Sequence, residues 1–144
     1  MGDSERGTDP AIAGLVSSAR AAAELAHAPY SGFRVGAAVL GATGVHTAAN
    51  VENASYGLSL CAERAALSRA LAEGDGEGIR AIAVACVDAA PDSPLGEVMP
   101  CGACRQWLAE LAPKADVHIA TADGGVRTFT VDDLLPHAFV LRRG

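Results

Sequence analysis

The chain has 144 residues, half of them hydrophobic, which is the length of one ordinary domain and enough to bury a substantial core. Its formal net charge of −6 argues against an anionic partner such as a nucleic-acid backbone or the surface of an acidic membrane. No stretch is long and apolar enough to span a bilayer, and the first residues lack the apolar core of a secretion signal. We therefore expect a cytoplasmic protein that binds neither nucleic acid nor membrane.

The N-terminal third of the chain is predicted to form a helix followed by a hairpin. Residues 1–9 are polar and show no periodicity, so they are interpreted as a flexible arm, which leaves 10–144 as a single domain. Apolar residues at helical spacing, with a proline in the first turn, predict a helix over 10–28. Two apolar segments on either side of a glycine-containing turn, 34–41 and 44–52, predict a β-hairpin.

The rest of the chain is predicted to alternate between helices and strands. The expected elements are a helix from Cys61, a buried strand over 79–87, a helix over 101–112, a strand pair over 115–121 and 126–131, and a helical turn at 132–136. The buried strand is a short apolar run between turn-forming residues, as in a central strand. This order of elements predicts an α/β domain in which helices cover both faces of a sheet.

Three cysteines lie where two of these helices begin. Cys101 and Cys104 are three residues apart, so both side chains lie on one face of the first helical turn. Cys61 begins the other helix, and helix starts favour thiolate over thiol because they are the positive ends of helix dipoles. Three thiolates suit zinc and leave its fourth coordination position open, as in a catalytic site. Inside a cell, such a cluster is more typical of a metal site than of disulfides.

Glu63 and Cys86 decide what such a site does. Glu63 follows Cys61 by two residues and is placed to move protons beside the metal. Taken alone, an acidic residue at a helix start is explained more simply by the helix dipole. Cys86 lies in an apolar strand, where a core position is the simplest interpretation, whereas a role as fourth ligand would make the site structural.

The motifs around these residues have a known form. Zinc-dependent nucleobase deaminases combine three His or Cys ligands with a non-ligand Glu and a Pro-Cys-x-x-Cys segment. The chain resembles the small, all-cysteine cytidine deaminases that act on free nucleosides, from about Ala28 to Phe139. The resemblance rests on five blocks in this order: "PYSGFRVGAA", "NVENASYG", "CAER", "PCGACRQ" and "LLPHAF".

The resemblance implies a cytidine deaminase-like, three-layer α-β-α sandwich with a mixed five-stranded sheet. It implies one Zn²⁺ per chain, held by Cys61, Cys101 and Cys104. Glu63 then moves the protons of catalysis, and Arg64 hydrogen-bonds the ligand thiolates. The implied reaction is hydrolytic deamination of cytidine and 2′-deoxycytidine to uridine and 2′-deoxyuridine, with release of ammonia, in pyrimidine salvage.

The resemblance also implies substrate contacts and an assembly. The expected contacts are Phe33 at the pyrimidine ring, Asn50 and Glu52 at the ribose, backbone near Ala62 at the base edge, and Tyr56 and Phe139 at a subunit boundary. The implied assembly is a homotetramer in which Phe139 reaches a neighbouring subunit's pocket. On spacing alone, Asn50 and Glu52 point to the same side of a strand end, where they could bind sugar hydroxyls or simply form a turn.

Three other functions remain open from the sequence. A deaminase of a modified cytosine nucleoside such as blasticidin S would share the chemistry, but the "NVENASYG" block favours an enzyme that binds ribose. A redox protein would also have Cys-x-x-Cys at a helix start, but this function leaves the Cys-Ala-Glu segment unexplained. A non-catalytic zinc module would need Cys86 to close the site.

Overall fold

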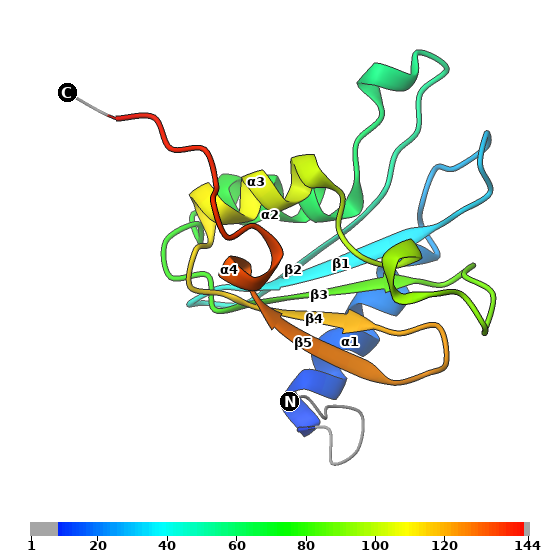
Figure 1. Ribbon diagram of the computed structural model, residues 1–144, viewed down its shortest axis with the longest axis horizontal. Coiled ribbons are helices and arrows are strands. Elements are labelled where there is room, and N and C mark those ends of the chain that lie inside the picture. The colour runs from blue at the N-terminus through cyan, green and yellow to red at the C-terminus, as the bar shows by residue number, and fades with distance from the viewer. Residues whose placement is uncertain (1–8, 143–144) are drawn as a thin grey trace.

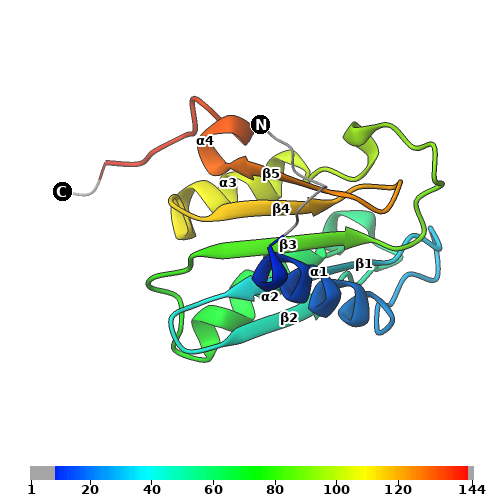
Figure 2. The same cartoon turned by 90° about the horizontal axis from the view of Figure 1, so that it is seen from below.

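The structure, a computed structural model, describes residues 9–142 and consists of a five-stranded sheet between two layers of helices (Figure 1, Figure 2). The helices are α1 (Pro10–Ala23), α2 (Ala62–Ala72), α3 (Gly102–Leu111) and α4 (Val131–Leu134), with 3₁₀ turns η1 (Tyr56–Leu58) and η2 (Leu95–Glu97). The strands are β1 (Val35–Leu40), β2 (Val45–Ala49), β3 (Ala81–Cys86), β4 (Asp116–Ala120) and β5 (Val126–Thr130).

The strands lie in the order β2-β1-β3-β4-β5. Strands β3 and β4 are parallel, and the other neighbouring pairs are antiparallel. Helix α1 covers one face of the sheet, while α2, α3 and α4 lie against the other (Figure 1). This arrangement confirms the predicted three-layer α-β-α sandwich with a mixed five-stranded sheet.

Alternation along the two central strands separates two hydrophobic cores. Val39, Ile82 and Val84 belong to the core that includes residues of α2 and α3. Ala38 and Ala83 point the other way, into the core beneath α1. Because successive side chains of a strand point to opposite faces, one sequence supplies both cores. The larger side chains lie on the α2 and α3 face, and mostly small ones lie under α1.

Helix α1 approaches the sheet closely at Gly36. A Cβ atom at this position would lie 1.9 Å from the carbonyl oxygen of Ala19 in α1, which is too close for any side chain. The helix ends at Ala23, so the predicted helix over 10–28 is wrong in its last turn. Pro29 disfavours helical backbone at the residue before it, and the amide of His27 instead donates to the carbonyl of Asn50 over 3.0 Å.

The last residue of the predicted flexible arm, Asp9, is the N-cap of α1. Asp9 caps the helix, because its side chain accepts a hydrogen bond from the amide of Ala11 over 2.7 Å. The rest of that arm, residues 1–8, lies outside the described residues, so the division into an arm and one domain stays a prediction. In the part of the chain that is described, no helix has the length and hydrophobicity required to cross a membrane.

Candidate active site

Three cysteine sulfurs meet where α2 and α3 begin. Cys61 is the N-cap of α2, Cys101 is the N-cap of α3, and Cys104 follows in the first turn of α3. The sulfur of Cys101 lies 3.9 Å from that of Cys61 and 3.6 Å from that of Cys104. All three sulfurs lie within 4.8 Å of one another. The structure therefore brings together the three cysteines that the sequence predicts to share a metal ion.

The spacing of these sulfurs fits a tetrahedral zinc ion. Zn–S bonds of about 2.3 Å place the sulfurs of a tetrahedral site about 3.8 Å apart, close to the two separations above. Three thiolates are donors that zinc prefers, and three protein ligands leave one coordination position for water or substrate. Cys86 is not part of the cluster, and among residues 9–142 no other His, Cys, Asp or Glu group has this metal-binding geometry. The closed four-cysteine site considered above is therefore not formed.

Arg64 supplies a positive charge next to the cluster. Its Nη2 atom donates a hydrogen bond to the sulfur of Cys61 over 3.3 Å. Hydrogen bonds from Cys104 and Arg64 lower the pKa of Cys61 to about 5. The pKa of Cys104 is raised, because its thiol donates to the Cys61 thiolate. Of Cys61 and Cys104, Cys61 therefore carries negative charge more readily, and Arg64 stabilises that charge.

Glu63 is buried beside the cysteine cluster. It lies in the first turn of α2 and only 5% of its surface is exposed. Burial raises the pKa of Glu63 to about 7, and the neighbouring Cys61 thiolate acts in the same direction. A carboxyl group whose pKa is near neutrality can both accept and return protons. A glutamate that served only the helix dipole would gain nothing from this burial, because its charge is most stable in water.

A cavity of about 300 Å³ adjoins the cluster, and we call it the cysteine cavity because Cys61, Cys86 and Cys101 line it. Five other residues predicted to contact substrate or move protons also line it: Phe33, Asn50, Glu52, Ala62 and Glu63. They come from the turn before β1, the segment after β2 and the first turn of α2. The structure thus brings most of the predicted site to one place.

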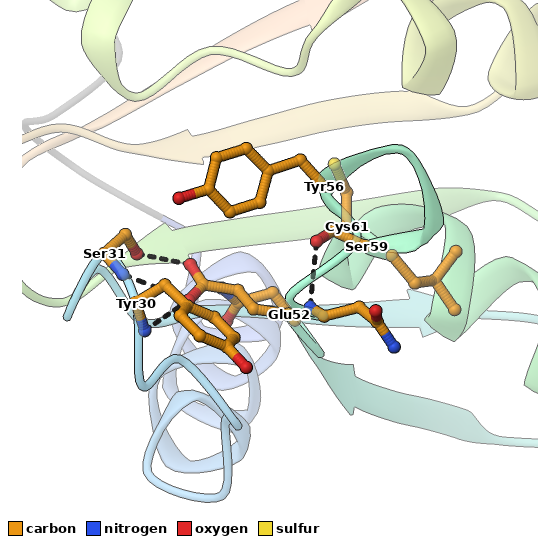
Figure 3. Close-up of a pocket in the computed structure, with 9 residues that line it drawn as sticks. Tyr30, Ser31, Glu52, Tyr56, Ser59 and Cys61 are labelled. Carbon is orange, nitrogen blue, oxygen red and sulfur yellow. Dashed lines mark hydrogen bonds between the residues drawn. The ribbon is translucent and has the colours of Figure 1, made fainter.

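A second cavity, of about 420 Å³, shares four lining residues with the first: Ser31, Asn50, Glu52 and Cys61. We call it the tyrosine cavity, because Tyr30 and Tyr56 line it (Figure 3). The two rings form an edge-to-face pair with centroids 6.4 Å apart. Tyr56 is largely exposed in the single chain, and its place at a subunit boundary stays a prediction.

Glu52 lies between the two cavities and is held by one turn. The amides of Tyr30 and Ser31 donate to its Oε1 atom over 3.0 and 3.1 Å, and the hydroxyl of Ser31 donates to Oε2 (Figure 3). The hydrogen bonds from Ser31 and Tyr30 lower the pKa of Glu52, which therefore stays ionised. A carboxylate has about four lone-pair positions. Glu52 thus has acceptor capacity left for a ligand hydroxyl.

Asn50 uses its side-chain amide within the protein. Its Oδ1 accepts from the amide of Val35 over 2.8 Å, and its Nδ2 donates to the carbonyl of Phe33 over 3.0 Å. These bonds fix the backbone on both sides of Arg34, where β1 begins. Asn50 therefore positions Phe33, a role that the spacing of Asn50 and Glu52 did not predict.

Phe139 lies outside both cavities of its own chain. Its side chain is 70% exposed, and the next two residues, Val140 and Leu141, are also largely exposed. Gln106 of α3 donates from Nε2 to the carbonyl of Phe139 over 3.0 Å. The backbone is therefore attached to α3 while the ring is directed elsewhere. Within one chain, the structure does not bring Phe139 to the predicted substrate residues.

Other residues of the cysteine cavity were not predicted from the sequence. They are Ser31, Val35, Cys86, Glu97 and Met99. Burial raises the pKa of the Cys86 thiol to about 12, so this residue is a neutral part of the wall. Glu97 and Met99 come from the segment before α3, which has no periodic pattern. Their proximity to the "CGAC" motif is the one sequence feature that could have indicated them.

Comparison with known proteins identifies the same region. Residues 12–120 match the family model described as the cytidine and deoxycytidylate deaminase zinc-binding region. A cytidine deaminase of Halalkalibacterium halodurans is 47% identical over 127 residues, which cover 87% of this chain and 91% of the relative. A cytidine deaminase of Mycobacterium tuberculosis is 46% identical over 129 residues, covering 88% of each chain.

Solved structures give the same result for the fold. The crystal structure of a cytidine deaminase from Burkholderia pseudomallei superposes with a TM-score of 0.78 at 48% identity, covering 88% of this chain and 98% of that one. The structure of cytidine deaminase from Mycobacterium tuberculosis gives a TM-score of 0.73 at 39% identity, covering 92% of this chain and all of that one. The similarity therefore extends over nearly the whole of both chains.

Proposed function

The chain belongs to the cytidine deaminase family, and from this membership we propose that it hydrolyses cytidine and 2′-deoxycytidine to uridine and 2′-deoxyuridine, releasing ammonia. The observation that carries the proposal is the juxtaposition of a buried, proton-accepting Glu63 with three sulfurs spaced for zinc, all at one cavity. A redox protein would not need this glutamate, and a structural zinc module would not leave a coordination position open.

Glu63 is the residue that moves protons in this proposal. Cys61, Cys101 and Cys104 would hold the zinc ion, whose contribution would be a water of lowered pKa at the site. Glu63 accepts a proton from the attacking water and delivers it to N3 of the cytosine ring. It then takes the proton of the hydroxyl newly bound at C4 and passes it to the amine, so that C4 becomes a carbonyl as the C4–N bond breaks and ammonia leaves. Its raised pKa suits both directions of transfer, because neither form is strongly favoured at pH 7.

Arg64 and the substrate residues have supporting roles. Arg64 draws negative charge from the Cys61 sulfur, which leaves the metal a stronger Lewis acid. The ring of Phe33 packs against the pyrimidine, and the backbone near Ala62 binds its edge. The remaining acceptor position of Glu52 binds a ribose hydroxyl, and Asn50 acts there by holding the Phe33 turn.

The assembly and the location belong to the same proposal. A homotetramer would cover the exposed Phe139, Val140 and Leu141, and Phe139 would enter a neighbouring chain's site beside Tyr56. A cytoplasmic location fits three metal-binding thiols, because a reducing compartment keeps them free of disulfides. The substrate is a small nucleoside, and the proposal includes neither nucleic acid nor membrane.

The test of the reaction is ammonia release from cytidine, 2′-deoxycytidine and blasticidin S, with one zinc per chain verified by metal analysis. Glu63→Gln keeps the shape of the side chain but cannot accept the proton, so we expect kcat to fall about 10²–10⁴-fold with zinc retained. Glu110→Gln, at an exposed position of α3, is the matched control and should behave as the parent. Near-normal turnover by Glu63→Gln, or ammonia from blasticidin S alone, would overturn the proposal.

The test of the shared site is complementation. Phe139→Ala and Glu63→Gln are each expected to be inactive, but hybrids formed by co-expression should contain some sites with both residues intact. Partial recovery of activity, together with a tetramer by light scattering, is the expected outcome. A monomer, or inactive hybrids of verified mixed composition, would mean that each chain completes its site alone.

A further inference from the structure

The two cavities carry acidic side chains and no basic one. Among the described residues that line them, Glu52, Glu63 and Glu97 are acidic, and none is Lys, Arg or His. A zinc ion with three thiolates has a net negative formal charge as well. A ligand that enters the cysteine cavity therefore encounters a negative potential on several sides.

Glu97 differs from the other two glutamates because neither burial nor a hydrogen bond from the described residues holds its side chain. Glu52 is bound by the Tyr30–Ser31 turn, and Glu63 is buried beside the sulfurs. Glu97 lies at the end of η2, is exposed, and its carboxylate has no hydrogen-bond or salt-bridge partner among residues 9–142. Its charge is therefore free to act on whatever enters the cavity.

We propose that Glu97 is a specificity-determining residue that excludes phosphorylated cytosine nucleosides from the cysteine cavity. The inference rests on the proposed function, in which the substrate is a free nucleoside, and assigns to Glu97 the exclusion of the phosphorylated form. The family description covers deaminases of cytidine and of deoxycytidylate, which differ in a phosphate. A phosphomonoester carries a charge of about −1.5 to −2 at pH 7. The cavity lining offers no cation to compensate it, so its desolvation and its repulsion by Glu97 both oppose binding.

Glu97 is close enough to repel a phosphate at any position in the cavity. A roughly spherical cavity of about 300 Å³ is about 8 Å across, which is no larger than the Debye length of about 8 Å at physiological ionic strength. A phosphate in the cavity or at its rim is therefore within about one Debye length of Glu97, where salt screens the repulsion only in part. The effect on a neutral nucleoside is small by comparison, because a neutral ligand has no net charge to repel.

The experiment compares kcat/KM for 2′-deoxycytidine and its 5′-monophosphate in the zinc-loaded parent and in the variants Glu97→Gln and Glu97→Lys. We expect the ratio of nucleotide to nucleoside kcat/KM to rise about 3–10-fold in Glu97→Gln and about 10–100-fold in Glu97→Lys. The nucleoside kcat/KM is the internal reference for each variant, so a loss common to both substrates leaves the ratio unchanged. Added salt should reduce the difference between the variants.

The matched control is Glu110→Lys, which makes the same change of net charge on α3, outside both cavities. This variant should leave the ratio unchanged. An unchanged ratio in both Glu97 variants, an equal rise in Glu110→Lys, or efficient use of the nucleotide by the parent would overturn the inference. Calorimetric binding of the products, 2′-deoxyuridine and its 5′-monophosphate, gives the same comparison without turnover. Failure of the proposed reaction would therefore be seen separately, as absence of ammonia from the parent.

Discussion

Arg64 donates a hydrogen bond to the sulfur of Cys61 over 3.3 Å, so a permanent cation lies against one of the three sulfurs of the cluster. The sulfurs of Cys61 and Cys104 in turn raise the pKa of Arg64, so the guanidinium stays charged under all working conditions. Its Nε atom is buried and has no hydrogen-bond partner among the described residues. An unpaired buried donor lowers the stability of the fold. The position of Arg64 is therefore better explained by its contact with the cysteine cluster.

Arg64→Gln should reduce kcat about 10–100-fold, the usual range for loss of a partner that orients or polarises a metal ligand. KM should change little, because Arg64 does not line the cysteine cavity. Steady-state kinetics at verified zinc content would measure both constants. Arg69→Gln, a change of the next arginine of α2, is the control and should keep kcat. An equal fall of kcat in both variants, or a rise of KM with kcat unchanged, would show that Arg64 acts only by stabilising α2.

Removal of single cysteines should divide them into two classes. Cys61→Ala, Cys101→Ala and Cys104→Ala should each lose zinc and activity together, since each removes one of three ligands. Cys86→Ala should keep both, because its thiol lies outside the cluster. Zinc content by metal analysis, with activity measured on the same samples, would separate the two classes. Zinc loss in Cys86→Ala would instead support a closed structural site.

Asn50→Ala should destabilise the protein as well as lower its activity. The change removes hydrogen bonds to Phe33 and Val35 and leaves partly buried backbone groups unpaired, at a cost of about 1–3 kcal/mol in the free energy of unfolding. Urea denaturation of the zinc-loaded protein would measure it. Asn50→Asp keeps the acceptor for Val35 but loses the donor to Phe33, so an intermediate loss is expected. A rise in KM at unchanged stability would show that Asn50 acts on substrate alone.

His46 should make the stability of the protein depend on pH. Its buried ring lies between two carboxylates, with Nδ1 bonded to Glu73 and Nε2 at 2.7 Å from Asp75. Hydrogen bonds to Asp75 and Glu73 raise the pKa of His46 above 6.5. The same bonds lower the pKa values of both carboxylates. The third charged group on this cluster is Arg69, which reaches the other oxygen of Glu73 over 3.3 Å.

The pKa shifts of His46, Glu73 and Asp75 determine how the stability of the protein depends on pH. The charged form of His46 is favoured by folding, so its contribution is complete below its unfolded pKa and is lost as pH rises through the raised folded value. The carboxylates contribute above their unfolded pKa values and lose that contribution as pH falls through the lowered ones. Stability from this cluster should therefore be greatest at mildly acidic pH. Urea denaturation from pH 5.5 to 8.5 should show a decline that His46→Gln lacks, and identical profiles would exclude the effect.

The sequence was sufficient for the parts of the site that depend on local spacing. Cys101 and Cys104 share a helical turn, and Glu63 follows Cys61 in another, so their types and intervals already indicate a metal and a proton carrier. The order of periodic segments likewise predicted the layers of the fold, because helical and strand periods differ.

The parts that were missed depend on contacts between distant segments. The amide of Asn50 is used by backbone fifteen and seventeen residues earlier, a pairing that strand register sets and residue type does not. Glu97 belongs to an aperiodic loop whose path brings it to the cavity. The end of α1 was placed too late because an Ala-rich pattern continues past Ala23, while pairing of His27 with the segment after β2 ends the helix.

The two ends of the described chain leave the molecule from opposite layers. Helix α1 begins at Pro10 on one face of the sheet, whereas Phe139 is attached to α3 on the other, where Cys61 and Cys101 also lie (Figure 1). For immobilisation on a sensor surface or for fusion to an affinity tag, the N-terminus is therefore the better point of attachment. A bulky group joined at the C-terminus would begin just beyond the exposed Phe139, where it would compete with whatever that ring contacts.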